Sequence, residues 1–215
     1  MSRRGVFINF EGGDGCGKTT QMRLLAEALR RAGHEIVETT EPGGTRIGKQ
    51  IRRILLDSEN EELCPTAEML LYFASRAQNV EEVILPALAR GAVVLTDRFT
   101  DSTMAYQGFG RGLGQELVID LDRVSCHGLA PDLTILIDID LETSLARARD
   151  RNLASTESRM DAQAIEFHRK VREAYLHMAG REPARFRIVD GTGAIEVVSR
   201  AVLSAALPLL QRCAG

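Results

Sequence analysis

The chain has 215 residues, 44% of them hydrophobic and 27% charged, proportions that are ordinary for a globular protein with a large core. Its 27 lysine and arginine residues against 30 aspartate and glutamate give a net charge of −3, so nothing global favours binding to nucleic acid or to a membrane. The four cysteines are far apart and form no C-x-x-C pair, which argues against a disulfide framework or zinc site and favours the reducing cytoplasm.

Strand and helix patterns alternate along the chain. Short apolar runs predict strands over residues 5–10, 34–40, 92–97, 131–138 and 186–190. Apolar residues at helical spacing predict helices over residues 20–32, 46–56, 65–90, 115–127, 141–151, 159–180 and 194–211. The glycine-rich stretch 100–114 is expected to be a mobile loop or a broken helix. The alternation predicts a parallel α/β sheet with helices on both faces, in a single domain over residues 1–215.

The two ends of the chain fit this scheme. The first residues run directly into the first predicted strand and leave no room for a signal peptide. The last predicted helix is apolar on one side but contains Glu196, Arg200 and Pro208, so we expect a packed amphipathic helix there and not a membrane span.

The first predicted strand leads into a glycine-rich segment of the form G-x-x-x-x-G-K-[ST], with Gly12, Gly17, Lys18 and Thr19 at the fixed positions. A strand before it and a helix after it are the context in which backbone N–H groups converge on a phosphate. A glycine turn with a chance lysine is the alternative, and both flanks argue against it. We therefore predict ATP and phosphate contacts from Gly12, Gly13, Asp14, Gly15, Cys16, Gly17, Lys18, Thr19 and Thr20.

Other polar residues follow the predicted strands at their carboxyl ends, where open parallel sheets bind ligands. Glu41 follows the second strand, Asp97 and Arg98 follow the third, and residues 190–192 follow the fifth. Asp97 could hold Mg²⁺, accept a proton or merely cap the next turn. Arg98 beside it favours a functional site, because arginine is the preferred bidentate ligand of phosphate.

Several arginines surround a polar segment at residues 152–158, namely Arg147, Arg149, Arg151 and Arg159. Phosphoryl transfer is accelerated by cations that a closing element brings to the moving group. The same cations would also complement the dipole at a solvated helix end. We favour the first interpretation and predict a flexible lid over about residues 147–160, with at least one catalytic arginine.

The third predicted helix carries Tyr72 and Arg76 four residues apart, so both side chains share a face. An aromatic ring beside a guanidinium can stack on a planar base and hydrogen-bond its edge, although the neighbouring Phe73 could equally be a core residue. The four histidines show no ligand spacing and receive no role. Asp138 and Asp140 are expected to cap the following helix.

Several short segments follow one another along the chain: F-E-G-G-D-G-C-G-K-T-T-Q at residues 10–21, E-P-G-G-T at 41–45, D-R-F at 97–99, A-Y-Q-G at 105–108 and R-G at 111–112. In order and spacing they resemble the signatures of the thymidylate kinase family, which phosphorylates dTMP to dTDP. The resemblance covers almost the whole chain and is of the bacterial type, with arginines in the lid. It implies a three-layer α/β/α P-loop NTPase fold with a five-stranded parallel sheet. It also implies ATP as phosphoryl donor, Mg²⁺ as cofactor, a place in dTTP biosynthesis and a homodimer.

The resemblance also implies roles for individual residues. Asp14 would contact the 3′-hydroxyl of the sugar, Arg52 and Arg98 would hold the dTMP phosphate, and Tyr106 would disfavour a 2′-hydroxyl. Either Tyr72 or Phe73 would stack on thymine, Arg76 would bond its O4, and Thr103 and Gln107 would read its edge. The catalytic group would comprise Lys18, Glu41, Asp97, Arg98, Arg149 and Arg151, and the metal ligands would be Thr19 and Asp97. Two positions depart from the family pattern: Thr40 replaces an arginine, and Tyr72 replaces a phenylalanine.

Overall fold

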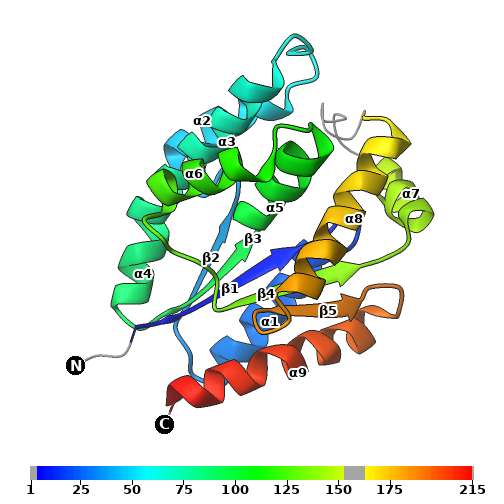
Figure 1. Ribbon diagram of the computed structural model, residues 1–215. Coiled ribbons are helices and arrows are strands. Elements are labelled where there is room, and N and C mark those ends of the chain that lie inside the picture. Colours follow the sequence, from blue (N-terminus) through cyan, green and yellow to red (C-terminus); the bar gives the residue numbers. More distant parts are fainter. Residues whose placement is uncertain (1–3, 153–162, 215) are drawn as a thin grey trace.

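The computed structural model describes residues 4–152 and 163–214 and contains a five-stranded parallel sheet in the order β2-β3-β1-β4-β5 (Figure 1). The strands are β1 (Val6–Glu11), β2 (Ile36–Thr40), β3 (Val93–Asp97), β4 (Leu133–Asp138) and β5 (Phe186–Asp190). The register pairs Phe10 of β1 and Thr40 of β2 with Asp97 at the end of β3. The carboxyl ends of these three strands therefore meet at one edge of the sheet, as the sequence predicts.

Helices cover both faces of the sheet. They are α1 (Lys18–Arg31), α2 (Arg46–Leu56), α3 (Pro65–Asn79), α4 (Leu85–Ala89), α5 (Thr100–Thr103), α6 (Gln115–Cys126), α7 (Leu141–Asn152), α8 (Ile165–Arg181) and α9 (Ile195–Ala214), with the π-helices η1 (Val80–Ile84) and η2 (Met104–Gly110). Helices α1 and α9 pack on one face, whereas η1, α4, η2 and α8 pack on the other (Figure 1). The predicted three-layer α/β/α architecture is confirmed.

The central strand β1 has a nearly continuous apolar sequence because it is covered on both faces. All six of its residues are buried, and successive side chains point to opposite faces. Ile8 and Phe10 join the core beneath α1 and α9, while Phe7 joins the core on the opposite face and meets the edge of the Phe99 ring. The phosphate loop that follows β1 is thus anchored in both layers of the core.

Three helical predictions need correction or refinement. The single helix expected over residues 65–90 contains the π-helix η1 between α3 and α4. Of the two alternatives for residues 100–114, the broken helix is observed, as α5 and η2. The helix expected from residue 159 is observed from Ile165, and residues 163 and 164 before it are not helical. Residues 159–162 lie outside the described residues. Across the described ranges, no helix is long and apolar enough to cross a membrane.

Candidate active site

The phosphate loop depends on glycine at two positions. Gly12 has φ +143°, and a Cβ there would lie 2.4 Å from the carbonyl oxygen of Ile137 and 2.8 Å from Sγ of Cys16. Gly17 has φ 92° at the N-cap of α1, where no side chain from the described chain caps the helix. Both conformations are accessible mainly to glycine. The first N–H groups of α1 therefore stay available to an anion at this helix end.

Lys18 and Thr19 lie at the start of α1 beside the end of β3. The Lys18 ammonium donates to the carbonyl oxygen of Gly13 at 3.3 Å, so the side chain lies against the loop. The Thr19 hydroxyl donates to Oδ2 of Asp97. A hydroxyl and a carboxylate in contact are the oxygen donors that Mg²⁺ prefers, and Mg²⁺ in nucleotide sites usually takes only one or two protein ligands. Thr19 and Asp97 therefore fit Mg²⁺, the ion that they were predicted to hold.

Arg98 links the phosphate loop to the helices beyond β3. Its backbone has φ 75°, in the left-handed region that a side chain rarely adopts. Its guanidinium donates from Nη2 to Asp14 Oδ1 at 2.9 Å and to the Tyr106 hydroxyl at 3.1 Å. From Nη1 it donates to the hydroxyls of Ser102 and Tyr175, both at 3.0 Å. The structure thus brings together three predicted ligands of dTMP, Asp14, Arg98 and Tyr106, which come from three different elements.

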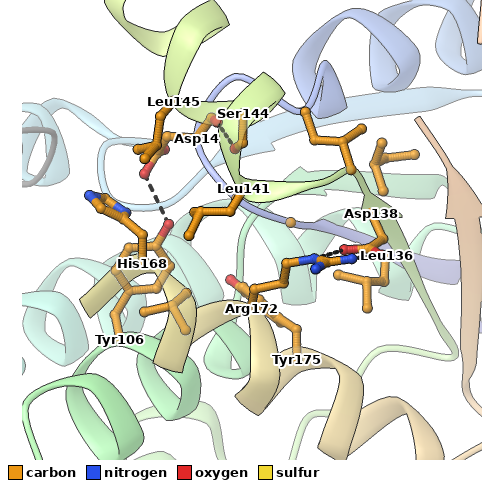
Figure 2. Close-up of a pocket in the computed structure, with 15 residues that line it drawn as sticks. Asp14, Tyr106, Leu136, Asp138, Leu141, Ser144, Leu145, His168, Arg172 and Tyr175 are labelled. Carbon is orange, nitrogen blue, oxygen red and sulfur yellow. Dashed lines mark hydrogen bonds and ion pairs between the residues drawn. The ribbon is translucent and has the colours of Figure 1, made fainter. Parts of the chain in front are cut away.

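Figure 2 shows a pocket that Asp14, Tyr106 and Tyr175 of this cluster help to line, between the phosphate loop, the end of β4, α7 and α8. The Tyr106 hydroxyl donates to Asp14 Oδ2 at 3.0 Å, and Ser144 donates to the backbone oxygen of Asp14 at 2.5 Å. His168 lies beside this contact, is only 6% exposed, and its Nε2 finds no hydrogen-bond partner in the described chain. Burial raises the pKa of Tyr106 well above its usual value, so its hydroxyl stays neutral and available as a donor.

The two aspartates that follow β4 have different roles. Asp140 Oδ1 accepts a hydrogen bond from the Thr143 N–H at 2.8 Å, which confirms the predicted cap of α7 and lowers the pKa of Asp140. Asp138 does not cap the helix. It instead accepts two hydrogen bonds from Arg172 of α8, both at 2.8 Å (Figure 2). This bidentate ion pair ties α8 to the edge of the sheet, a contact that the local sequence does not predict.

Arg76 lies at the centre of a second hydrogen-bonded cluster, which is buried inside the protein. It is 1% exposed, and its Nε lies 2.5 Å from Glu41 Oε2. Its Nη2 donates to the Phe99 carbonyl oxygen at 3.1 Å and to the Thr103 hydroxyl at 2.9 Å, while Nη1 has no partner in the described residues. Burial raises the pKa of Glu41, and the charge of Arg76 acts in the opposite direction. A buried guanidinium with one unsatisfied nitrogen is costly unless a ligand completes its hydrogen bonds.

Tyr72 and Phe73 lie in different environments on α3. Phe73 is 2% exposed and packs with Met69 and Val118 in a core cluster. The Arg76 guanidinium carbon lies 4.9 Å from the centre of the Phe73 ring, so this ring supports Arg76 from within the core. Tyr72 is half-buried and is therefore the more accessible of the two rings. This arrangement favours Tyr72 as the ring that would face a base.

Comparison with known proteins identifies the family. The family model described as thymidylate kinase matches residues 10–202. The chain is 52% identical to the thymidylate kinase of Pelobacter propionicus over 94% of both chains. It is 50% identical to the thymidylate kinase of Geobacter sulfurreducens over 97% of this chain and 99% of that one, and 50% identical to that of Pelotomaculum thermopropionicum over 96% and 95%.

The chain belongs to the thymidylate kinase family. This membership confirms the resemblance found in the sequence.

Other residues singled out in the sequence are placed as follows. Gln107 is 1% exposed, and its amide donates to Glu68 Oε1 at 2.8 Å. Arg52 donates to the carbonyl oxygen of Pro42 at 2.8 Å. Arg147 donates to the carbonyl oxygen of Gly191 at 3.4 Å. The side chains of Arg149 and Arg151, the whole of Arg159 and most of the predicted lid lie outside the described residues.

Sequence reasoning missed two acidic residues of this thymidylate kinase family site. Glu68 is fully buried, and besides Gln107 it accepts hydrogen bonds from Arg111, at 3.2 Å and 3.1 Å. In the sequence it reads as an acidic residue in the first turn of a helix, which is a common surface position. Glu11 is fully buried at the end of β1, one residue beyond the predicted strand, and it received no role although it lies in the signature segment 10–21. A charged residue directly after a buried strand was the signal that could have found it.

Proposed function

We propose that this chain transfers the γ-phosphoryl group of ATP to dTMP, giving ADP and dTDP for dTTP biosynthesis. The observation that carries the proposal is Arg98, which joins Asp14 of the phosphate loop to Tyr106 of η2. An arginine at this junction can hold an acceptor phosphate beside the place where the loop holds the donor. Family membership supplies the thymidylate preference.

The proposed mechanism is a direct in-line transfer. The loop amides and Lys18 hold the β- and γ-phosphates of ATP, while Arg98 and Arg52 hold the phosphate of dTMP. The acceptor phosphate is already anionic near neutral pH, so little general-base help is needed. Catalysis then consists mainly of positioning and charge neutralisation. Mg²⁺, held through Thr19 and Asp97, would supply positive charge at the donor phosphate oxygens.

The base would be recognised by Arg76 and the residues around it. Arg76 has a buried nitrogen without a partner in the described chain, and this nitrogen can donate to O4 of thymine. Tyr72 on the same helix would stack on the ring, and Thr103 and Gln107 would read its edge. Tyr106 would disfavour a ribose, because its ring and hydroxyl occupy the space beside Asp14. Glu41 would act here by holding Arg76, with which it is paired.

The lid is proposed to span residues 147–160 and to close over the phosphates. Arg149 is our first choice for the catalytic lid arginine and Arg151 our second, because helix α7, which carries both, starts beside the phosphate loop at the Ser144–Asp14 contact. A cation delivered by a closing element stabilises the charge that builds up on the transferred group.

We also propose that the enzyme is a cytoplasmic homodimer. Helices α2, α3 and α6 lie side by side on the outside of the molecule (Figure 1). They expose large apolar side chains, namely Ile47, Ile54, Leu70, Leu117, Ile119 and Val124. A second copy of the chain is the occupant that the family resemblance implies for such a surface. The free thiols of Cys16, Cys64 and Cys126 suit the reducing cytoplasm.

A coupled ADP-release assay tests the proposed reaction. MgATP is supplied with dTMP, dUMP, dGMP, dCMP or AMP in turn, and we expect a strong preference for dTMP. Lys18→Ala and Arg98→Ala should each lower turnover by about a hundredfold or more while the fold survives. Lys170→Ala, which removes an exposed lysine of α8, is the matched control and should retain full activity.

Two other functions predict different results. A kinase of the same fold for other nucleotides would use several monophosphates equally well, which would reject the assigned base-reading residues. A module that only binds ATP would show no dependence of ADP release on dTMP. Near-normal turnover in both Lys18→Ala and Arg98→Ala would reject the mechanism itself.

A further inference from the structure

Glu11 is a buried carboxylate that the mechanism above does not use. It is 0% exposed and is the last residue of β1, directly before the phosphate loop. Within the described chain its Oε1 accepts hydrogen bonds from Asn9 Nδ2 at 3.0 Å, Phe99 N at 2.9 Å and Ser102 N at 3.1 Å. Its Oε2 accepts from the Ser102 hydroxyl at 2.6 Å and the Tyr175 hydroxyl at 2.7 Å. Both oxygens therefore face donors, which an ionised carboxylate satisfies best.

The two hydroxyls on Oε2 are the same ones that contact Arg98. Ser102 Oγ and Tyr175 OH each lie 3.0 Å from Arg98 Nη1. A guanidinium can only donate, so both hydroxyl oxygens must act as acceptors toward Arg98. Each hydroxyl has a single proton. The two hydroxyls lie 2.9 Å from each other, so one can donate to the other, but the acceptor-only carboxylate of Glu11 is the stronger acceptor for both protons. Glu11 thereby sets the orientation of both hydroxyls and, through them, the position of the guanidinium.

Glu11 also holds the backbone next to Arg98. The left-handed conformation of Arg98, with φ 75°, is unfavourable for a residue with a side chain. Its own N–H bonds to the carbonyl oxygen of Phe10 at 3.0 Å, and the next N–H, that of Phe99, bonds to Glu11 Oε1 at 2.9 Å. The end of β1 therefore holds the turn on both sides of the strained residue.

We propose that Glu11 is a positioning residue that aims Arg98 at the phosphate of the acceptor nucleotide. This inference rests on the proposed function. Glu11 acts through Ser102, Tyr175 and the Phe99 N–H and does not itself touch the substrate. Its direct Coulomb contact with Arg98 is longer, with Nη1 and Oε2 separated by 3.9 Å.

The substitution Glu11→Gln keeps the shape of the side chain and removes its charge. An amide presents one oxygen and one NH₂ group, so in either orientation an N–H faces groups that were donating to the carboxylate. If the NH₂ group faces Ser102 and Tyr175, their hydroxyls must accept from it. These hydroxyls lie 2.9 Å apart, so one proton can turn to the other hydroxyl, and the second proton is left to compete with Arg98 Nη1. The guanidinium then loses an acceptor and moves, and the affinity for the substrate phosphate falls.

The test compares the affinity of the whole enzyme for dTMP with its affinity for thymidine by isothermal titration calorimetry. The ratio of the two affinities isolates the contribution of the phosphate. In Glu11→Gln we expect this ratio to fall by about tenfold or more, as for a lost charge-assisted hydrogen bond, while thymidine affinity stays within about twofold. The KM for dTMP should rise in parallel and the KM for ATP should change little. A purely structural role would reduce the folded fraction but leave the ratio unchanged.

Asp132→Asn is the matched control, because the Asp132 carboxylate also accepts a backbone N–H of β1, that of Phe7 at 2.8 Å, near the start of the strand and away from Arg98. This variant should keep the wild-type ratio. If Glu11→Gln does not fold, Ser102→Ala decides, since it removes one of the two hydroxyls between Glu11 and Arg98 and should lower the ratio as well. A wild-type enzyme that binds dTMP no better than thymidine would reject the proposed function. The inference on Glu11 alone would be overturned if the wild-type enzyme binds dTMP better than thymidine but the folded Glu11→Gln variant keeps the wild-type affinity ratio. If Glu11→Gln does not fold, a wild-type ratio in Ser102→Ala would overturn it in the same way.

Discussion

The buried pair between Arg76 and Glu41 allows a quantitative test of the structure. The side chains of these residues are 1% and 2% exposed, and their contact is 2.5 Å. Arg76→Met replaces the guanidinium by an apolar chain of similar length. It leaves the Glu41 carboxylate in the core with one other side-chain hydrogen bond among the described residues, from the Asn79 amide at 3.0 Å. Removing one partner of a buried pair typically costs about 3–5 kcal/mol, against a total stability of about 5–15 kcal/mol.

An exposed pair in the same chain provides the control. Arg90 contacts Glu35 at 2.7 Å, but the two side chains are 48% and 56% exposed. Arg90→Met therefore breaks an ion pair of similar geometry that is exposed to water. We expect it to lower the free energy of unfolding by at most about 1 kcal/mol. Urea unfolding followed by circular dichroism, with the free energy extrapolated to zero denaturant, measures both variants.

The pH dependence adds a second criterion. Burial raises the pKa of Glu41 in the folded protein, and Arg76 opposes that rise, so the pKa should rise further when the arginine is removed. A carboxyl with a raised folded pKa contributes stability at low pH that is lost as the pH rises toward that folded pKa. The difference in stability between wild type and Arg76→Met should therefore narrow as the pH is lowered from about 7.5 toward the unfolded pKa of about 4.3. Equal losses in Arg76→Met and Arg90→Met, or a difference that widens at low pH, would refute this reasoning.

Two further predictions concern the cysteines and the outer helices. Cys64 is exposed, whereas Cys16 and Cys126 are buried and burial raises the pKa of both thiols. Iodoacetamide at about pH 8 should therefore modify Cys64 in the native protein, and Cys16 and Cys126 only after unfolding. Modification of Cys16 or Cys126 in the native protein, found by peptide mass spectrometry, would contradict their burial. Leu70 is 49% exposed on α3, and Leu70→Glu should convert the proposed dimer to a monomer in light scattering. An unchanged mass would place the contact between copies elsewhere.

The fold could be predicted from the sequence because its signals are local. The central strands β1, β3 and β4 are short, mainly apolar runs of the kind expected for a sheet buried on both faces, and the segment from Gly5 to Thr19 specifies a strand, a turn and the start of a helix in succession. Parallel topology then brings the carboxyl ends of the strands together, so Asp97 and Arg98 were expected beside the phosphate loop. The contacts of Thr19 with Asp97 and of Asp14 with Arg98 agree with this expectation.

The remaining features depend on contacts that no local pattern encodes. The π-helix at Val80–Ile84 differs from the α-helices on either side by one residue per hydrogen-bonded turn, and apolar spacing does not resolve that difference. Asp138 looks like a helix cap, and its true partner, Arg172, is 34 residues away. Which of two plausible partners an aspartate chooses is decided by tertiary packing and not by its neighbours in the sequence.

The position of Glu11 in the sequence could have indicated a buried cluster of hydrogen-bond donors. A carboxylate at the end of a strand that is buried on both faces loses its water shell, and such a group persists only where several donors replace that water. The donors come from Asn9, Phe99, Ser102 and Tyr175, which are up to 164 residues distant, so their identity could not be read locally. Their existence, however, follows from the burial of the charge alone. A glutamate in the apolar strand before a phosphate loop therefore predicts a cluster of donors, and in this structure that cluster surrounds Arg98, the residue proposed to hold the substrate phosphate.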